Sequence, residues 1–155
     1  MKKVKDFMTK KVIYFSPEDT IFKVAEVFAK RKISGAPVLK NGKVVGIISV
    51  SDIVKFINMK VKKSFPSMPS LSLLALFLIK SGKDFIEFKK NLKKIADAKI
   101  EKFMSKKVIW IEPEASIFDA AYLMQKHDVN RLPVIKNGKL VGIITREDLV
   151  RALVD

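Results

Sequence analysis

Cysteine is absent from the 155-residue sequence, and histidine occurs only once. Without cysteine the chain has no disulfide, no thiolate metal ligand and no cysteine nucleophile, a composition that fits a reducing compartment. The single histidine, His127, has no second His or Cys to complete a metal site. Neither a Ser-His-Asp set nor a Gly-rich phosphate loop of the P-loop or Rossmann type is recognisable. We therefore expect a protein that is not an enzyme and that carries no metal or cofactor.

Long hydrophobic runs are also missing. The longest, "LSLLALFLI" at 71–79, has nine residues, about half of the roughly 20 that a membrane-spanning helix needs. The first residues, "MKKVKDFMTKK", lack the apolar core of a secretory signal. These features predict a cytoplasmic protein without a membrane span.

Acidic residues are scarce beside basic ones. The chain has 31 Lys and Arg against 16 Asp and Glu, a formal net charge of +15. Residues 58–102 alone carry eleven Lys and four acids, so their charge is about +7 (11 − 4). Such an excess favours a polyanionic partner, and binding of nucleic acid through this segment and the N-terminus is an alternative function. Solvated surface lysines explain the same charge equally well.

An internal duplication dominates what is present. "KNGKVVGIISVSD" at 40–52 returns as "KNGKLVGIITRED" at 136–148, with nine of thirteen residues unchanged after a shift of 96. Residues 7–57 align with 103–153 without a gap, and 24 of the 51 positions are identical. The duplication predicts three parts: a first repeat at 1–57, a basic helical insert at 58–102 and a second repeat at 103–155.

Each copy predicts a β-α-β-β-α unit. "KKVIYFSP" and "KKVIWIEP" are β-rich runs that end at a proline, and a helix with apolar residues at helical spacing follows. Asp19 or Thr20, and Ser116, are the expected N-caps. Two apolar strands around Asn-Gly then form a hairpin, and a last helix closes the unit. We expect an α+β fold of tandem repeats packed around a pseudo-twofold axis, because each copy alone has too little interior to be stable.

The insert between the copies repeats nothing. "KKSFPSMPS" at 62–70 cannot continue the preceding helix. Helices are expected at 71–79 and within 84–100, the latter with its apolar face formed by Phe85, Phe88, Leu92 and Ile95. The insert is interpreted either as a cap over exposed core or as an arm that docks a partner.

A hydroxyl followed three residues later by a carboxylate begins the last helix of each copy. In the first copy these residues are Ser49 and Asp52, and in the second they are Thr145 and Asp148. The spacing resembles a capping box, which satisfies free amides at a helix start. The same helix start suits a phosphate group, and a carboxylate one turn later suits the two hydroxyls of a ribose. Capping and binding are compatible.

The duplicated unit, with "PV", "NGK-V-GIIS/T" and the final S/T-x-x-D, resembles a CBS domain pair, also called a Bateman module. The resemblance covers both copies and leaves out the insert. It implies a regulatory module whose two clefts bind adenosine-containing ligands such as AMP, ADP, ATP or S-adenosylmethionine. It also implies a homodimer that passes occupancy to a protein partner.

Roles follow from the resemblance position by position. Asp52 and Asp148 would hold ribose, and Ser49, Thr145, Arg131 and Arg146 would meet phosphate. The base would lie near Ser16, Ile21, Ser34 and Gly35 in one cleft, and near Glu112, Ile117, Asn130 and Arg131 in the other. The copies differ, because Gly35 and Val50 stand where the second copy has Arg131 and Arg146. We therefore expect the phosphate contacts to belong mainly to the second copy.

Overall fold

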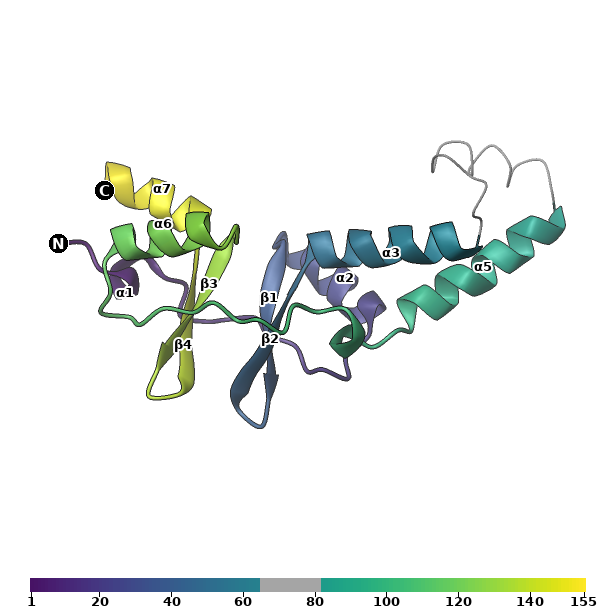
Figure 1. Ribbon diagram of the computed structural model, residues 1–155, viewed down its shortest axis with the longest axis horizontal. Helices are drawn as coiled ribbons and strands as arrows, with labels where there is room; N and C mark the ends of the chain where they lie inside the picture. The colour runs from purple at the N-terminus through teal and green to yellow at the C-terminus, as the bar shows by residue number, and fades with distance from the viewer. Residues whose placement is uncertain (65–81) are drawn as a thin grey trace. The chain divides into compact units, whose positions relative to one another are not determined.

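The computed structural model describes residues 1–64 and 82–155 (Figure 1). Its elements follow the duplication: a first copy of helix, hairpin and helix, then the insert, then a second copy. Their bounds, in chain order, are α1 Val4–Phe7, α2 Ile21–Arg31, β1 Gly35–Lys40, β2 Lys43–Ser49, α3 Val50–Ser64, α5 Gly82–Ala96, the 3-10 helix η1 Ile100–Lys102, α6 Ile117–Lys126, β3 Arg131–Lys136, β4 Lys139–Thr145 and α7 Arg146–Val154. The strands form two separate two-stranded sheets, so the predicted α+β class is confirmed.

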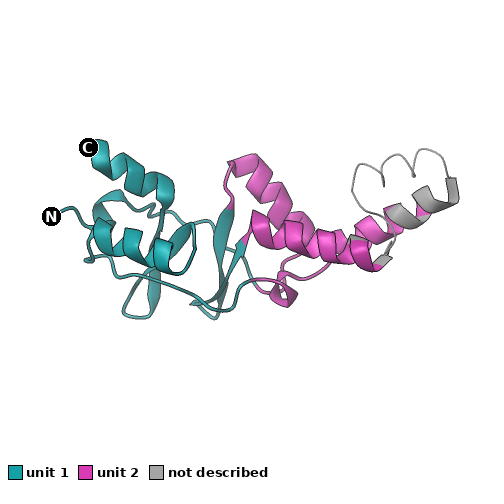
Figure 2. Cartoon of the chain, turned by 45° about the horizontal axis from the view of Figure 1, so that its top comes forward, with its two compact units in different colours: residues 1–16, 35–48, 105–155 teal, residues 17–34, 49–104 magenta. Residues whose placement is uncertain are grey.

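The chain divides into two compact units (Figure 2). One contains residues 1–16, 35–48 and 105–155, and the other contains residues 17–34 and 49–104. The units do not follow the repeats, because the hairpin of the first copy belongs to the unit that holds the whole second copy. The predicted limits 1–57, 58–102 and 103–155 remain a prediction.

Both hairpins turn at Asn-Gly, as predicted. Asn41 and Gly42 have φ of 51° and 75°, and Asn137 and Gly138 have 52° and 75°. Positive φ at both central residues is the requirement of the tight turn that matches strand twist, and Asn and Gly are the residues that accept it. The turn at Asn137 sets the antiparallel register of β3 on β4, from Arg131 opposite Thr145 to Lys136 opposite Lys139.

The predicted first strand of each copy is present only as a single bridge residue. The segments around Phe15 and Ile111 make one parallel bridge each, to Val38 and to Val134. Phe15 N donates to Pro37 O at 3.1 Å, and Phe15 O accepts from Leu39 N at 2.8 Å. A further bridge on the N-terminal side would need an N–H from residue 37, and proline has none. Pro133 limits the parallel pairing of the Ile111 segment in the same way.

The segments at Val4 and at Ile100, which are equivalent after the shift of 96 residues, each pair with the other copy. Within the first unit, Val4 N donates to Ala115 O at 2.9 Å, and Thr9 exchanges two hydrogen bonds with Ile143. Within the second unit, the equivalent donor Ile100 N reaches Asp19 O at 2.9 Å. Val4 and Ile100 therefore each donate a hydrogen bond to the segment just before the first helix of the other copy, α6 or α2.

The N-terminal segment also contributes to the hydrophobic core of the second copy. Val4 is fully buried in a cluster with Ile111 and with residues of α6, β3 and β4: Ala120, Met124, Leu132, Val134 and Ile144. Gly142 leaves room for the side chain of Met8. A Cβ atom at residue 142 would lie only 2.5 Å from Met8 Sδ and would clash with it. Val4 and Met8, in the segment 4–9, thus pack into this core.

The insert is helical where it is described. α5 confirms a helix within 84–100 and buries Ile95, whereas Leu92 is exposed. The helix expected at 71–79 lies outside the described residues. In the part of the chain that is described, no helix has both the length and the apolar character needed to cross a membrane.

Candidate functional site

The second S/T-x-x-D motif forms a complete capping box at the start of α7. Thr145 Oγ1 accepts from Asp148 N at 3.3 Å, while Asp148 Oδ2 accepts from Thr145 N at 2.8 Å and from Thr145 Oγ1 at 3.0 Å. Asp148 is only 6% exposed. The structural interpretation of the motif is therefore confirmed, and the carboxylate is held in one orientation at the helix start.

The first motif has the same geometry at the start of α3. Asp52 Oδ2 accepts from Ser49 N and from Ser49 Oγ, both at 2.9 Å, and Ser49 Oγ accepts from Asp52 N at 3.3 Å. Asp52 is half-buried. No described residue donates to its second carboxylate oxygen, Oδ1.

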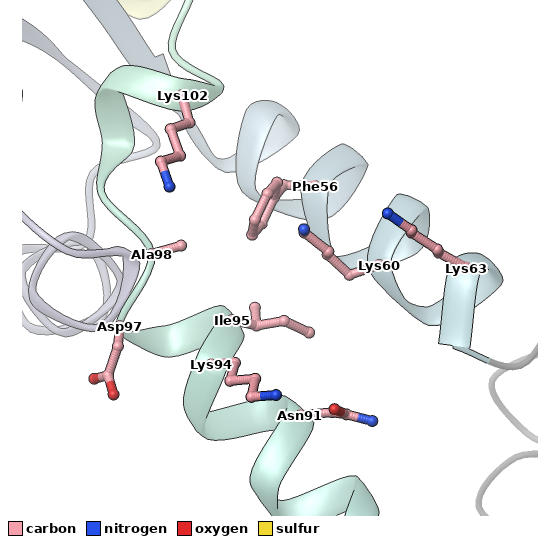
Figure 3. A pocket seen from close by; sticks show the side chains of 9 residues that line it. All are labelled: Phe56, Lys60, Lys63, Asn91, Lys94, Ile95, Asp97, Ala98 and Lys102. Carbon is pink, nitrogen blue, oxygen red and sulfur yellow. The ribbon is translucent and has the colours of Figure 1, made fainter.

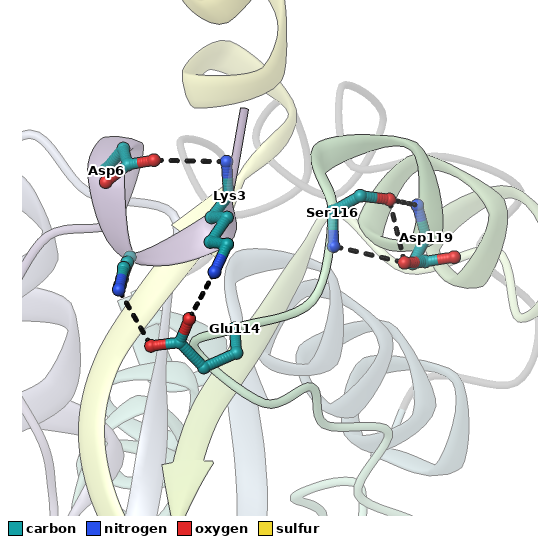
Figure 4. A network of polar contacts seen from close by, with 6 residues as sticks. Lys3, Asp6, Glu114, Ser116 and Asp119 are labelled. Carbon is teal, nitrogen blue, oxygen red and sulfur yellow. Dashed lines mark hydrogen bonds and ion pairs between the residues drawn. The ribbon is translucent and has the colours of Figure 1, made fainter. Parts of the chain in front are cut away.

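A third box of the same type shows that the motif alone does not define a binding site. At the start of α6, Asp119 Oδ2 accepts from Ser116 N at 3.0 Å and from Ser116 Oγ at 2.7 Å (Figure 4). These hydrogen bonds lower the pKa of Asp119 below its ordinary value. Asp119 is exposed, whereas Asp52 and Asp148 are partly or fully buried. Burial, rather than spacing, distinguishes the two candidate ribose carboxylates. Thr20 caps α2 with a single hydrogen bond, from Lys23 N.

Backbone hydrogen bonds attach each motif to the start of the first hairpin strand of its own copy. Val50 N donates to Ser34 O at 2.9 Å, and Arg146 N donates to Asn130 O at 3.1 Å. Both Ser34 and Asn130 are exposed. The structure therefore brings one predicted base-binding residue of each copy beside the helix start that carries the predicted phosphate and ribose contacts.

The two arginines of the second copy lie in different surroundings. Arg131 is only 9% exposed, and its guanidinium occupies the space that a Cβ of Gly35 would fill. Arg146 is half exposed and lies 3.8 Å from an oxygen of Asp128. Both arginines lower the pKa of Glu147, after the larger effects of hydrogen bonds from its own backbone amide and the Thr145 hydroxyl. Of the two, only Arg146 presents its side chain to solvent beside the motif.

The remaining predicted base contacts flank the helix starts. Ile21 and Ile117 are the first residues of α2 and α6, and both are buried. Ser16 is half-buried and Glu112 is exposed, each one residue beyond the single parallel bridge of its copy. None of the thirteen predicted contacts lines the cavity of about 620 Å³ that is found beside α3 and α5.

Sequence reasoning missed Arg151. Its Nη2 donates to Asp148 Oδ1 at 2.6 Å and to the Phe7 carbonyl oxygen at 3.3 Å. Both oxygens of Asp148 are thus engaged within the protein. An arginine three residues after an acid on a helix was the available signal, because such residues lie on one helix face.

Two copies of a helix, an Asn-Gly hairpin and a helix that begins with a capped, buried carboxylate define a tandem α+β repeat protein. The model of the CBS domain family matches residues 4–59 and 100–155, and the chain belongs to this family. The predicted resemblance to a CBS domain pair is therefore confirmed.

Relatives and solved structures agree with this assignment. Protein MJ1426 of Methanocaldococcus jannaschii is 43% identical over 153 residues, which are 97% of this chain and 90% of that protein. MJ1232 of the same organism is 32% identical over 152 residues, but the chain spans only 39% of its length. The crystal structure of CBSX2 in complex with AMP has a TM-score of 0.71 and 24% identity, over 99% of this chain and 97% of that one. The CBS domain pair of MJ0100, in complex with 5'-methylthioadenosine and S-adenosyl-L-methionine, has a TM-score of 0.72 and 23% identity, over 99% and 96% of the two chains.

Proposed function

We propose that the chain is a non-catalytic regulatory module that binds an adenosine-containing ligand at the starts of α3 and α7. The observation that carries the proposal is the pair of capped, partly or fully buried carboxylates, Asp52 and Asp148, at equivalent helix starts. The complexes of CBSX2 with AMP and of MJ0100 with S-adenosyl-L-methionine support an adenosyl ligand. AMP, ADP, ATP and S-adenosylmethionine are the candidates.

The chemistry of each helix start suits such a ligand. The first amides of α3 and α7 carry the positive end of the helix dipole, which favours phosphate. The hydroxyls of Ser49 and Thr145 lie at this position, and Arg146 adds a planar cation that can pair with phosphate oxygens. A carboxylate oxygen of Asp52 or Asp148 can accept a hydrogen bond from a ribose hydroxyl.

Isothermal titration calorimetry with the four candidate ligands tests the proposal, using Asp52→Ala and Asp148→Ala. The matched control is Asp119→Ala, which removes the third capping box and has no proposed ligand role. We expect at least one ligand to bind and one or both of the first two variants to lose binding. Absence of heat with every ligand, or equal loss in Asp119→Ala, would contradict the proposal.

We also propose that the module forms a homodimer and transmits ligand occupancy to a protein partner. Support comes from aromatic side chains exposed at equivalent positions of the two copies, Phe22 at 62% and Phe118 at 66%. Exposed apolar groups that form a contiguous patch mark protein contact surfaces. Light scattering of the parent and of Phe118→Ser tests this assembly, and a monomeric parent at high concentration would contradict it.

A further inference from the structure

A cavity of about 620 Å³ lies between α3, α5 and the residues that lead into and form η1 (Figure 3). All of its lining residues belong to the second compact unit. They are Phe56, Lys60, Lys63, Asn91, Lys94, Ile95, Asp97, Ala98 and Lys102. A volume of this size is within the range of small-molecule sites, about 300–1,000 Å³.

The apolar part of the cavity is fixed in place. Phe56 and Ile95 are both buried, and Phe56 stacks on Phe103 with ring centroids 4.6 Å apart. The ammonium group of Lys60 lies 5.4 Å from the centroid of Phe56. Figure 3 shows Phe56 and Ile95 on opposite sides of the opening, from different helices. This arrangement offers a preformed apolar contact to the body of a ligand.

The polar part of the cavity is strongly cationic. Four lysines and one aspartate give the lining a net charge of +3 (4 − 1). Among the described residues, none of these four ammonium groups has a carboxylate within ion-pair distance. Like charges around one cavity repel each other, and an anion bound among them relieves that repulsion.

The cavity is distinct from the proposed adenosyl sites. The CBS family model ends at residue 59 and resumes at residue 100. Seven of the nine lining residues fall between these limits, and only Phe56 and Lys102 lie within the matched ranges. A function of this cavity would therefore belong to the insert rather than to the family module.

We propose that this cavity binds a small amphipathic polyanion: a molecule with an aromatic or aliphatic body and at least two phosphate, sulfonate or carboxylate groups. The apolar body contacts Phe56, Ile95 and Ala98, and the charged groups face Lys60, Lys63, Lys94 and Lys102. Asn91 supplies a neutral hydrogen-bonding group at the same opening. Nucleic acid is a different partner, whose binding would follow the total charge of the surface.

Binding of a pyrene trisulfonate to the full chain tests the proposal, because this probe combines an aromatic body with several negative charges. Inorganic triphosphate tests charge alone, and a neutral pyrene alcohol tests the apolar contact alone. The decisive variant is Lys63→Gln/Lys94→Gln, which removes one lining lysine from each helix. Its matched control is Lys62→Gln/Lys93→Gln, which removes the same charge from the neighbouring positions on the same helices, neither of which lines the cavity.

We expect the pyrene trisulfonate to bind more tightly than either comparison probe. The dissociation constant should rise about tenfold in the lining variant, equivalent to about 1.4 kcal/mol, and less than about twofold in the control. Equal weakening by both variants would overturn the proposal and indicate attraction by the general surface charge. In an NMR titration with the same probe, chemical shift changes confined to residues away from Phe56 and Ile95 would also overturn it. Asp52→Ala and Asp148→Ala should leave probe binding unchanged, so failure at the adenosyl sites is distinguishable from failure here.

Discussion

Arg151 Nη2 lies 2.6 Å from Asp148 Oδ1, on the carboxylate oxygen that the capping box leaves available. In the first copy the position equivalent to Arg151 is Lys55, which is exposed and makes no described ion pair with Asp52. A ribose that binds Asp148 must therefore replace or share an arginine contact. A ribose that binds Asp52 has an oxygen without a described donor. The two proposed sites therefore differ in the free-energy cost of ribose binding, because only the second has an arginine contact to replace.

Arg151→Ala is expected to strengthen binding of an adenosyl ligand at the second copy. The contribution of a partly exposed ion pair is about 0.2–1 kcal/mol, so the gain should be about 1.4- to fivefold. Calorimetry on the parent and the variant measures it. Lys55→Ala is the matched control and should leave affinity unchanged. Weakening of binding by Arg151→Ala to the level of Asp148→Ala would instead place Arg151 in contact with the ligand.

Arg146→Gln should weaken AMP much more than adenosine. Arg146 is half exposed beside the start of α7, and a hydrogen bond to a charged group contributes about 1.5–3 kcal/mol. The expected loss for AMP is therefore roughly 10- to 100-fold, with adenosine affinity nearly unchanged. Arg31→Gln removes the same charge from the exposed last turn of α2 and serves as control. Parent-like AMP affinity in Arg146→Gln would remove this residue from the phosphate site.

Gly35→Ala should destabilise the fold through Arg131. A Cβ at residue 35 would overlap the guanidinium, and the buried arginine has to move to admit it. We expect a loss of about 1–2 kcal/mol in the free energy of unfolding, measured by urea denaturation. The same substitution in an Arg131→Ala background should cost less, because the overlapping group is gone. Equal costs in both backgrounds would show that the two residues are not coupled.

Glu114→Gln should remove an acid-sensitive contribution to stability. Hydrogen bonds from Lys3 and then Lys5, at 2.7 and 2.8 Å, lower the pKa of Glu114 to about 2 (Figure 4). The ordinary value is 4.5, so the contribution is complete above pH 4.5 and disappears as the pH falls to about 2. The difference in melting temperature between parent and variant should shrink over this interval. Glu26→Gln, at an exposed position on α2, serves as the control for the loss of one surface carboxylate.

Local chemistry explains which parts of the fold were predictable. Asn41 and Gly42, the N-caps Thr20 and Ser116, and the capping boxes at the starts of α3 and α7 depend on residues at most three positions apart. Their geometry is therefore visible in the sequence. The first strand of each copy is shorter than the sequence predicted, because the limiting residue, Pro37 or Pro133, is in the partner segment and not in the strand itself.

Contacts between distant residues explain what could not be predicted at the candidate site. Gly35 and Arg131 occupy equivalent positions of the two copies, and an alignment presents them as alternatives rather than as neighbours. Only the fold places the side chain of one in the space left empty by the other. Arg131 therefore combines a packing role with its proposed ligand contacts, whereas the sequence predicted only the ligand contacts.

The N-terminal segment has a consequence for the order in which the chain folds during synthesis. Val4 packs into a core formed by residues 111–144. Lys2 Nζ donates to Ala152 O at 2.7 Å, and Lys2 O accepts from Ile117 N at 3.2 Å. Residues 2–4 are thus synthesised well before the residues that bury them. Contacts of such long sequence separation close slowly because of the entropy of the intervening loop. The core of the second repeat is consequently complete only after these two distant segments have both been synthesised and have come together.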